Sequence, residues 1–271
     1  MKERLSEQLK KYTNNDGLFF MGDKILVDKT TKNPFLPLQN TLDKLNFTIL
    51  NALVDGSLIM VNGEIDLTED ELDKKNFSRY SVKKFLAESK PDDWSPILRA
   101  FHWINWDRQS KFCGRCGSVL EEKMDATEKK CPSCKTSIFP RFSPAVMVLI
   151  QNEDQILLAR SPHFQPGYYS AIAGFIDIGE TAEQAAHREV KEELGLEIRD
   201  LEYFSTQTWP FPDSFMIAFK AKYHGGELKL DEIEIEDARW FSPHELPQLP
   251  PYSSIARQLI ESALAGMIKR E

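Results

Sequence analysis

One unbroken run, from Gly174 to Leu196, constrains the fold of this chain more than any other segment. Thr181 and Gln184 have the spacing of a capping box, which starts a helix, and Gly195 stands where a glycine often ends one. The residues between these signals are mostly good helix formers. The run therefore predicts a helix over roughly residues 182–194.

The predicted helix has an apolar stripe and an acidic edge. At about 100° per residue, four apolar side chains fall on one face, which would pack against a sheet. They are Ala182, Ala186, Val190 and Leu194. Glu189 and Glu193, four residues apart, stand one above the other at the edge of this stripe, and Glu192 borders the same face.

Carboxylates this close together repel one another unless a cation lies between them. Mg²⁺ and Mn²⁺ prefer hard oxygen ligands and are often shared between carboxylates and substrate phosphates, so the acidic edge predicts a divalent cation site. Arg188 is expected to pair with a glutamate and hold its rotamer. The alternative interpretation of the same residues is a solvated acidic helix face.

The whole run reads G-x5-E-x7-R-E-V-x-E-E-x-G-L. It resembles the Nudix box, the signature of enzymes that hydrolyse a nucleoside diphosphate linked to another group. This resemblance favours the metal site over the solvated face. Glu180, nine residues before Glu189, is expected to brace the loop that precedes the helix.

Length and composition favour a globular protein of one large or two ordinary domains, because the 271 residues are 41% hydrophobic and 28% charged. The apolar stretches are too short to span a membrane, and the charged residues 1–7 lack the core of a signal peptide. We therefore expect a cytoplasmic protein. A formal net charge of −8 argues against broad nonspecific affinity for nucleic acids, though not against recognition of an RNA end.

All four cysteines fall in one short segment, as two C-x2-C pairs: Cys113, Cys116, Cys131 and Cys134. This spacing is typical of a tetrahedral Cys₄ site with no open coordination position, so we expect a structural Zn²⁺ ion. The alternatives are disulfides or a redox pair, which a cytoplasmic chain without a thioredoxin-like pattern disfavours. Nearby basic residues leave nucleic-acid binding open beside a solubilising role: Lys111, Arg115, Lys129, Lys130 and Lys135.

The chain divides into three expected parts: a smaller mixed α/β domain over residues 1–107, a zinc ribbon over 108–139, and a strand-rich domain over 140–271. In the first part we expect strands near 18–20, 24–27 and 57–61 and helices near 81–89 and 95–106. In the last part we expect strands near 145–150, 155–159, 168–175, 201–208, 214–223 and 238–241, and a final helix near 253–268. This order suits an α/β/α sandwich.

A second motif, Gln-Thr-Trp-Pro-Phe-Pro-Asp-Ser, occupies residues 207–214. It resembles the S-Q-P-W-P-F-P-x-S element of NADH pyrophosphatases, the NudC-type Nudix hydrolases. That family also places a Cys₄ zinc ribbon just before its Nudix domain and carries an additional N-terminal domain. The resemblance covers the ribbon and everything after it strongly, and residues 1–107 by architecture only.

The resemblance implies a Nudix α/β/α sandwich, usually in a homodimer, that acts as an NAD(+)/NADH diphosphatase. The family reaction splits the pyrophosphate of NADH into reduced nicotinamide mononucleotide and AMP, and members also remove NAD caps from RNA 5′ ends. The expected partners are therefore NAD(H) and NAD-capped RNA, without a membrane.

The resemblance also assigns metal ligands. Glu189 and Glu193 would bind Mg²⁺ or Mn²⁺ together with the backbone carbonyl of Ala173. Glu234 aligns with a further ligand, although the other two glutamates of residues 232–236 are close alternatives.

The substrate contacts implied by the resemblance are Phe139, Phe175, Gln207, Thr208, Trp209, Pro210, Phe211, Pro212, Asp213, Ser214 and Ala256. Two positions depart from the family pattern. Thr208 replaces a proline, which could loosen the loop, and Phe139 stands where a tyrosine is common, so stacking remains while a hydroxyl contact is lost. The alternative interpretation of the second motif is a rigid aromatic turn packed against the core.

The catalytic set would be Glu189, Glu192, Glu193 and Arg188. We expect water to attack one phosphorus while cations neutralise the phosphate oxygens. One carboxylate acts as the general base, and coupled titration leaves its identity open. Arg188 would orient a glutamate. NAD-capped RNA as the main substrate is one alternative; a catalytically silent sensor of NAD or ADP-ribose is another, which the intact carboxylates disfavour.

Overall fold

The computed structural model describes residues 9–121 and 128–268 and divides into two compact units, Met1–Arg141 and Phe142–Glu271. Residues 1–7, on which the signal-peptide argument rests, lie outside the described ranges. Within those ranges, none of the helices combines the length and the apolar character needed to cross a membrane.

The first unit is built on a sheet with the main path β4-β5-β1-β2-β6, to which β3 is added beside β1. Its strands are β1 (Asp16–Met21), β2 (Lys24–Asp28), β3 (Leu36–Pro37), β4 (Thr48–Asp55), β5 (Leu58–Glu64) and β6 (Phe77–Ser81). Neighbouring residues of β1 serve opposite faces. Phe19 packs edge-on against Phe47, while Phe20 meets Phe101 of a long helix.

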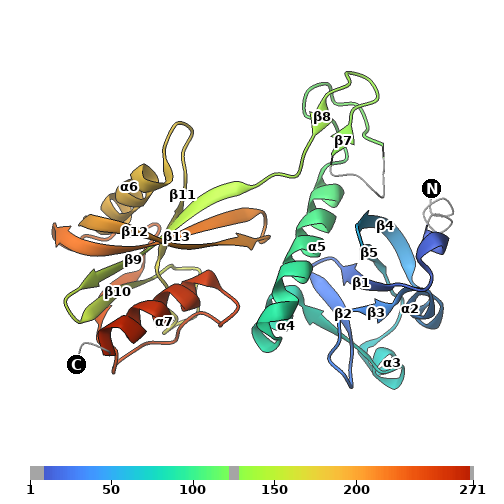
Figure 1. Ribbon diagram of the computed structural model, residues 1–271, viewed down its shortest axis with the longest axis horizontal. Helices are drawn as coiled ribbons and strands as arrows, with labels where there is room; N and C mark the ends of the chain where they lie inside the picture. The colour runs from blue at the N-terminus through green and yellow to red at the C-terminus, as the bar shows by residue number, and fades with distance from the viewer. Residues whose placement is uncertain (1–8, 122–127, 269–271) are drawn as a thin grey trace. The chain divides into compact units, whose positions relative to one another are not determined.

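Helices surround this sheet: η1 (Lys10–Tyr12), α2 (Leu38–Leu45), α3 (Glu69–Lys74), α4 (Val82–Glu88) and α5 (Pro91–Gln109). The long helix α5 packs on β1, β4 and β5 and then leads into the cysteine-containing segment (Figure 1). It begins at Pro91 rather than near residue 95, because proline is well suited to the first helical turn.

The expected strands near 18–20, 24–27 and 57–61 are confirmed as β1, β2 and β5, and the two expected helices as α4 and α5. The sequence pattern did not predict β4, β6, α2 or α3. A helix of six residues, such as α3, is too short to show a helical period, and its capping box at Thr68 is the one local signal for it.

The zinc-ribbon segment folds within the first unit as a short hairpin of β7 (Lys129–Lys130) and β8 (Ser137–Ile138), with an isolated bridge between Phe112 and Val119. Its small core contains Leu120 and two of the cysteines, with Ile138 packed against them. The three-part division of the chain stays a prediction.

The second unit has a sheet in the order β12-β13-β9-β10-β14, and β11 also pairs with β9. Its strands are β9 (Ser143–Asn152), β10 (Gln155–Arg160), β11 (Ile172–Phe175), β12 (Glu197–Trp209), β13 (Ser214–Gly225) and β14 (Asp237–Phe241). The strand expected over residues 168–175 is regular only from Ile172, because Tyr168 and Ser170 form isolated bridges with other segments.

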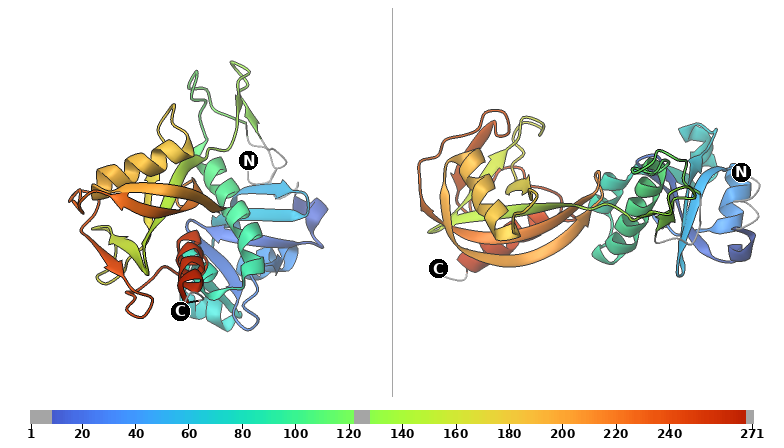
Figure 2. Two further views of the ribbon diagram at one scale, coloured as in Figure 1. Left: turned by 60° about the vertical axis from the view of Figure 1, so that its left-hand side comes forward. Right: turned by 90° about the horizontal axis from the view of Figure 1, so that it is seen from above.

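Two helices cover opposite faces of this sheet, α6 (Ala182–Leu194) and α7 (Ile255–Ile268) (Figures 1 and 2). Alternate residues of β9 divide between them. Val146, Val148 and Ile150 pack on the α6 side, whereas Ala145, Met147 and Leu149 pack on the α7 side. The expected α/β/α sandwich is therefore confirmed. Helix α6, which carries Glu189, Glu192 and Glu193, covers one of its two faces.

Candidate functional site

Helix α6 begins and ends at the residues that the sequence indicates. The Gln184 amide donates to Thr181 Oγ1 at 3.2 Å, and the Thr181 amide donates to Gln184 Oε1 at 2.9 Å, which completes the capping box. Gly195 ends the helix with a φ of 72°, in the left-handed region that favours glycine. These two ends fix the rotation of α6, so the acidic edge has a defined direction.

Arg188 is the organising cation of the loop and helix. Its Nε and Nη2 atoms bind the two oxygens of Glu180 at 2.6 and 2.8 Å, and Nη1 lies 2.9 Å from both Glu189 Oε1 and Glu192 Oε2. Nη2 also donates to the carbonyl of Phe175 at 2.9 Å. These bonds raise the pKa of Arg188 and lower that of Glu180 to about 2. Arg188 therefore orients glutamates and cannot serve as a base.

Glu189 packs directly on the backbone of Gly174. A Cβ atom at position 174 would lie 1.9 Å from Glu189 Cδ, so only glycine leaves room for this carboxylate. Burial raises the pKa of Glu189, and the Arg188 guanidinium opposes that effect. The first glycine of the Nudix run is thus explained by close approach rather than by a turn.

Glu193 is the most perturbed carboxyl of the site. It is only 8% exposed, and burial raises its pKa to about 8, with further contributions from Glu189, Glu234 and Asp231. The charges of Glu189 and Glu234 therefore act on Glu193, and the role of all three residues as metal ligands stays a prediction. The sequence interpretation missed Asp231, although it opens the acidic stretch over residues 231–237.

The other candidates from that stretch are occupied differently. Glu236 forms an ion pair with Arg160, and its amide donates to the Arg160 carbonyl at 2.8 Å. Glu232 is exposed. Ala173 lies on β11 directly before Gly174, and the role of its carbonyl stays a prediction.

The donor set fits a hard divalent cation. Glu189 and Glu193 are both largely buried, and burial is the main cause of their raised pKa values, to which repulsion by neighbouring carboxylates adds. Carboxylate oxygens are the ligands that Mg²⁺ and Mn²⁺ prefer, and such ions would relieve this repulsion.

The second motif forms the end of β12, a tight turn and the start of β13. Trp209 and Phe211 stack edge to face with ring centres 5.0 Å apart, and Trp209 packs against the core on the α7 side. Gln207 uses both ends of its amide: Nε2 donates to the Ser253 carbonyl at 2.8 Å, and Oε1 accepts from the Ile255 amide at 2.8 Å. Gln207 thus ties β12 to the first turn of α7.

The remaining predicted substrate contacts differ in accessibility. Ser214 and Ala256 are buried, and Asp213 accepts a hydrogen bond from Ser143 Oγ at 2.9 Å. Phe175 in the second unit and Phe139 in the first are 56% and 60% exposed. Thr208, Pro210 and Pro212 lie within the turn and its flanking strands. The substrate-binding roles of all these residues stay predictions.

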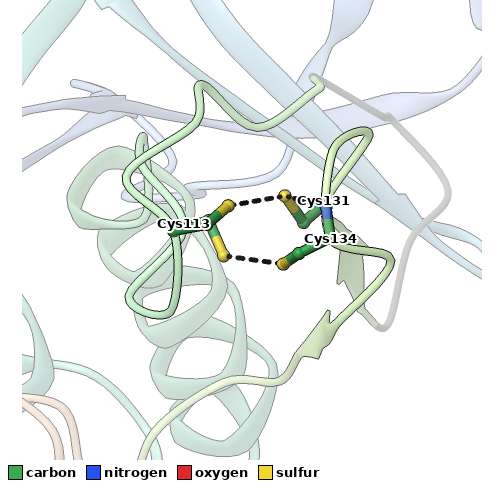
Figure 3. A group of neighbouring side chains, drawn as sticks. Cys113, Cys131 and Cys134 are labelled. Atoms are coloured by element: carbon green, nitrogen blue, oxygen red, sulfur yellow. Dashed lines mark hydrogen bonds between the residues drawn. The ribbon is translucent and has the colours of Figure 1, made fainter.

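The four cysteines converge in the first unit (Figure 3). Among the residues that the structure describes, they are the one group of His, Cys, Asp and Glu whose ligand atoms all lie within 4.8 Å of one another. Cys113 Sγ lies 3.6 Å from Cys134 Sγ, and Cys116 Sγ lies 3.6 Å from Cys131 Sγ. A tetrahedral zinc ion with bonds of about 2.3 Å requires sulfurs about 3.8 Å apart, whereas a disulfide requires about 2.05 Å.

The two cysteine pairs are built alike. The amides of Gly117 and Lys135 donate to the first cysteine carbonyl of their pair at 2.8 and 3.0 Å, and both residues have positive φ, 72° and 63°. Hydroxyls of Ser118 and Thr136 lie 3.4 and 3.3 Å from the second thiol of each pair. The Ser118 hydrogen bonds lower the pKa of Cys116 to about 6, which favours the thiolate form that metal binding would require.

Lys129 is buried, so neither interpretation of the basic residues near the ribbon, nucleic-acid binding or a solubilising role, applies to it. Its side chain is 3% exposed, and Nζ lies 2.7 Å from Asp107 Oδ1. Nζ also donates to the carbonyls of Asp107 and Ser110 at 3.0 and 2.9 Å, at the C-terminal end of α5. Lys129 therefore binds the ribbon to α5 and cannot contact nucleic acid.

Comparison with known proteins agrees with this geometry. Residues 141–263 match the model of the NUDIX domain family. A protein of Pseudomonas aeruginosa (strain LESB58) named "NAD-capped RNA hydrolase NudC" is 49% identical over 68% of this chain and 66% of its own length. A crystal structure of a NUDIX hydrolase from Nitrosomonas europaea is 24% identical, with a TM-score of 0.46 over 59% of this chain and 92% of that one.

A second relative, from Stutzerimonas stutzeri (strain A1501), carries the same name. It is 43% identical over 70% of this chain and 68% of its own length. Both matches span about two thirds of the relatives' length. With the α/β/α sandwich, the box and the four-cysteine cluster, they show that the chain belongs to the NudC family of Nudix hydrolases.

Proposed function

We propose that this protein hydrolyses the pyrophosphate of NAD(H) to nicotinamide mononucleotide and AMP, and that it also removes NAD caps from RNA 5′ ends. The observation that carries the proposal is the excess negative charge around buried Glu193, on the central helix of a Nudix domain. The names of the relatives support the choice of substrate, because both are called NAD-capped RNA hydrolases.

The ion that we propose is Mg²⁺ or Mn²⁺, held by Glu189 and Glu193 with help from Glu234 and the Ala173 carbonyl. When bound, such an ion neutralises charge on pyrophosphate oxygens and acidifies water. The protein's own contribution is orientation. Arg188 fixes the rotamers of Glu189 and Glu192, so their oxygens do not have to reorganise during the reaction.

The general base is one of the glutamates on α6, which receives the proton of the attacking water. Glu192 differs from its neighbours because its side chain is 59% exposed, whereas that of Glu189 is 13% exposed. Each of Glu189, Glu192 and Glu193 is a candidate for this base.

The dinucleotide would be held by aromatic side chains. Within the second unit, Phe175 is exposed enough to stack on a base, and Trp209 and Phe211 present a rigid aromatic pair. We assign Gln207 a supporting role, because both ends of its amide already bond to residues 253–255.

For the first unit we propose that the four cysteines hold a structural Zn²⁺ ion, in a protein that forms a homodimer. Metal analysis of the purified protein would give about one zinc per chain. Light scattering after size exclusion would give twice the 31.2 kDa chain mass.

The deciding experiment is product analysis by mass spectrometry. NADH, NAD⁺, ADP-ribose and a short NAD-capped RNA would be incubated with the full-length protein and Mg²⁺ or Mn²⁺. We expect nicotinamide mononucleotide with AMP, or with 5′-monophosphate RNA, and relative rates would identify the preferred substrate and ion. Tight binding of one compound without cleavage of any would instead support a sensor of NAD or ADP-ribose.

A further inference from the structure

The segment that carries Glu234 begins on the C-terminal end of α6. The Lys229 amide donates to the Leu194 carbonyl at 2.8 Å, and the Asp231 amide donates to the Glu193 carbonyl at 3.0 Å. The last carbonyls of a helix have no partner within the helix, so these two bonds satisfy groups that would otherwise remain open. They also fix the backbone of Asp231 beside Glu193.

The same segment is held at its other end. Ile235 is 6% exposed and packs in the core between α6 and the sheet, and the Glu236 amide bonds to the Arg160 carbonyl at the end of β10. Only residues 232–234 are left to bridge the two fixed ends. Their conformation therefore decides where the Glu234 carboxylate lies.

Asp231 folds this bridge into a turn. Its Oδ1 atom accepts the Ile233 amide at 2.9 Å, and its carbonyl accepts the amides of Glu234 and Ile235 at 3.1 and 2.8 Å. An aspartate that bonds to the backbone two residues later stabilises a turn in the same way as a backbone hydrogen bond. One residue thus supplies both the contact with α6 and the closure of the turn.

We propose that Asp231 is the positioning residue for the Glu234 side of the cation site, and that it acts through the hydrogen bond of its side chain rather than through its charge. This inference rests on the proposed function, because it takes Glu234 to be a ligand. Residues that orient metal ligands are typically worth about 10–100-fold in metal affinity.

The test separates the hydrogen bond from the charge. Asp231→Asn keeps an Oδ1 acceptor and removes the charge, whereas Asp231→Ala removes both. Mn²⁺ binding to the full-length protein would be followed by electron paramagnetic resonance of the free ion. We expect Asp231→Asn to bind within about 3-fold of wild type and Asp231→Ala to bind about 10–100-fold more weakly. Glu245→Ala, at an exposed carboxylate of the second unit outside this segment, is the control and should bind like wild type.

Two outcomes for the Asp231 variants would overturn the inference. Equal weakening in Asp231→Asn and Asp231→Ala would make Asp231 a charged ligand, and wild-type affinity in Asp231→Ala would leave it without a role. Asp231→Ser, with a shorter acceptor, should give an intermediate affinity and replaces Asp231→Ala if that variant does not fold. If the wild type binds Mn²⁺ and cleaves no substrate, the proposed function fails and the positioning role stands. If it binds no Mn²⁺, both fail.

Discussion

Each unit of this protein buries a group of charged side chains, and the two groups are opposite in design. In the first unit, Lys129 and Asp107 are each 3% exposed and neutralise one another. Asn51 Nδ2 donates to Asp107 Oδ2 at 2.6 Å, Asn62 donates to Asn51 Oδ1 at 2.8 Å, and Lys129 lies 5.3 Å from the centre of the Trp106 ring. Every charge in this group has a partner from the protein itself.

In the second unit, Glu193 is repelled by the charges of Glu189, Glu234 and Asp231. The cation Arg188 binds Glu189, but Glu180 already engages it through two hydrogen bonds. Burial and repulsion raise the pKa values of Glu189 and Glu193, whereas Arg188 keeps that of Glu180 low. A buried group that is neutral as a whole stabilises the fold or links its parts. One that keeps a net charge costs stability and indicates that the site binds a counter-ion.

The strongest test of this comparison is to remove one carboxylate from the acidic group of the second unit. Glu193→Gln should lower turnover of NADH by roughly 10²–10⁴-fold, because it removes a proposed ligand or base. The same change should raise the melting temperature without added Mg²⁺ or Mn²⁺ above pH 8, because Glu193, whose pKa is raised to about 8, is charged there and repels Glu189. Steady-state kinetics and thermal unfolding would check both signs. Near-wild-type turnover in a folded variant would refute the assignment.

Removing Lys129 from the neutral group of the first unit should lower stability instead of raising it. Lys129→Met leaves Asp107 buried without its cation, so we expect a loss of about 3–5 kcal/mol in the free energy of unfolding, measured in urea. Lys130→Met is the matched control, because Lys130 is exposed on the same strand, and it should change stability by less than about 0.5 kcal/mol. Combining Lys129→Met with Asp107→Asn should recover part of the loss.

A subtler perturbation moves a glutamate without removing it. In Gly174→Ala the new methyl group occupies the place of the Glu189 carboxylate, so we expect turnover to fall by about 10²-fold while the zinc content stays the same. Gly266→Ala in α7 is the control, since a Cβ there has no neighbour within 4 Å. Equal activity in the two variants would show that the position of Glu189 is unimportant.

The smallest expected effect tests whether the site depends on the stability of α6. Thr181→Ala removes the cap and should cost about 1 kcal/mol of unfolding free energy, whereas Thr181→Ser should retain most of it. Neither variant should change kcat for NADH, because the packing of α6 on the sheet still holds the glutamates. A loss of activity in proportion to the loss of stability would contradict this separation.

Much of the second unit was predictable because its signals are local. The capping box, the helical period and the final glycine of α6 lie within one short run, and hydrogen bonds between near neighbours fix them. The order of strands and helices likewise follows from alternation and turn residues, which is why the α/β/α sandwich was expected correctly. The cysteine spacing indicated their convergence for the same reason.

Contacts between distant segments could not be predicted in this way. Lys129 resembles any solvated lysine in the sequence, and only the approach of β7 to the end of α5 buries it. The amide of Gln207 bonds to residues 253–255 at the start of α7, a contact that the second motif alone does not indicate. Its contact with the substrate stays a prediction.

The sequence by itself determined the Nudix box, the helix that carries it and the clustering of cysteines, because each depends on spacing along the chain. Only the tertiary structure decided the partners of the acidic stretch over residues 231–237. Asp231 bonds to the end of α6, Ile235 is buried and Glu236 pairs with Arg160, whereas Glu234 as a ligand of the cation stays a prediction. Burial then strengthened the repulsion among these carboxylates, because in water they would repel one another only weakly.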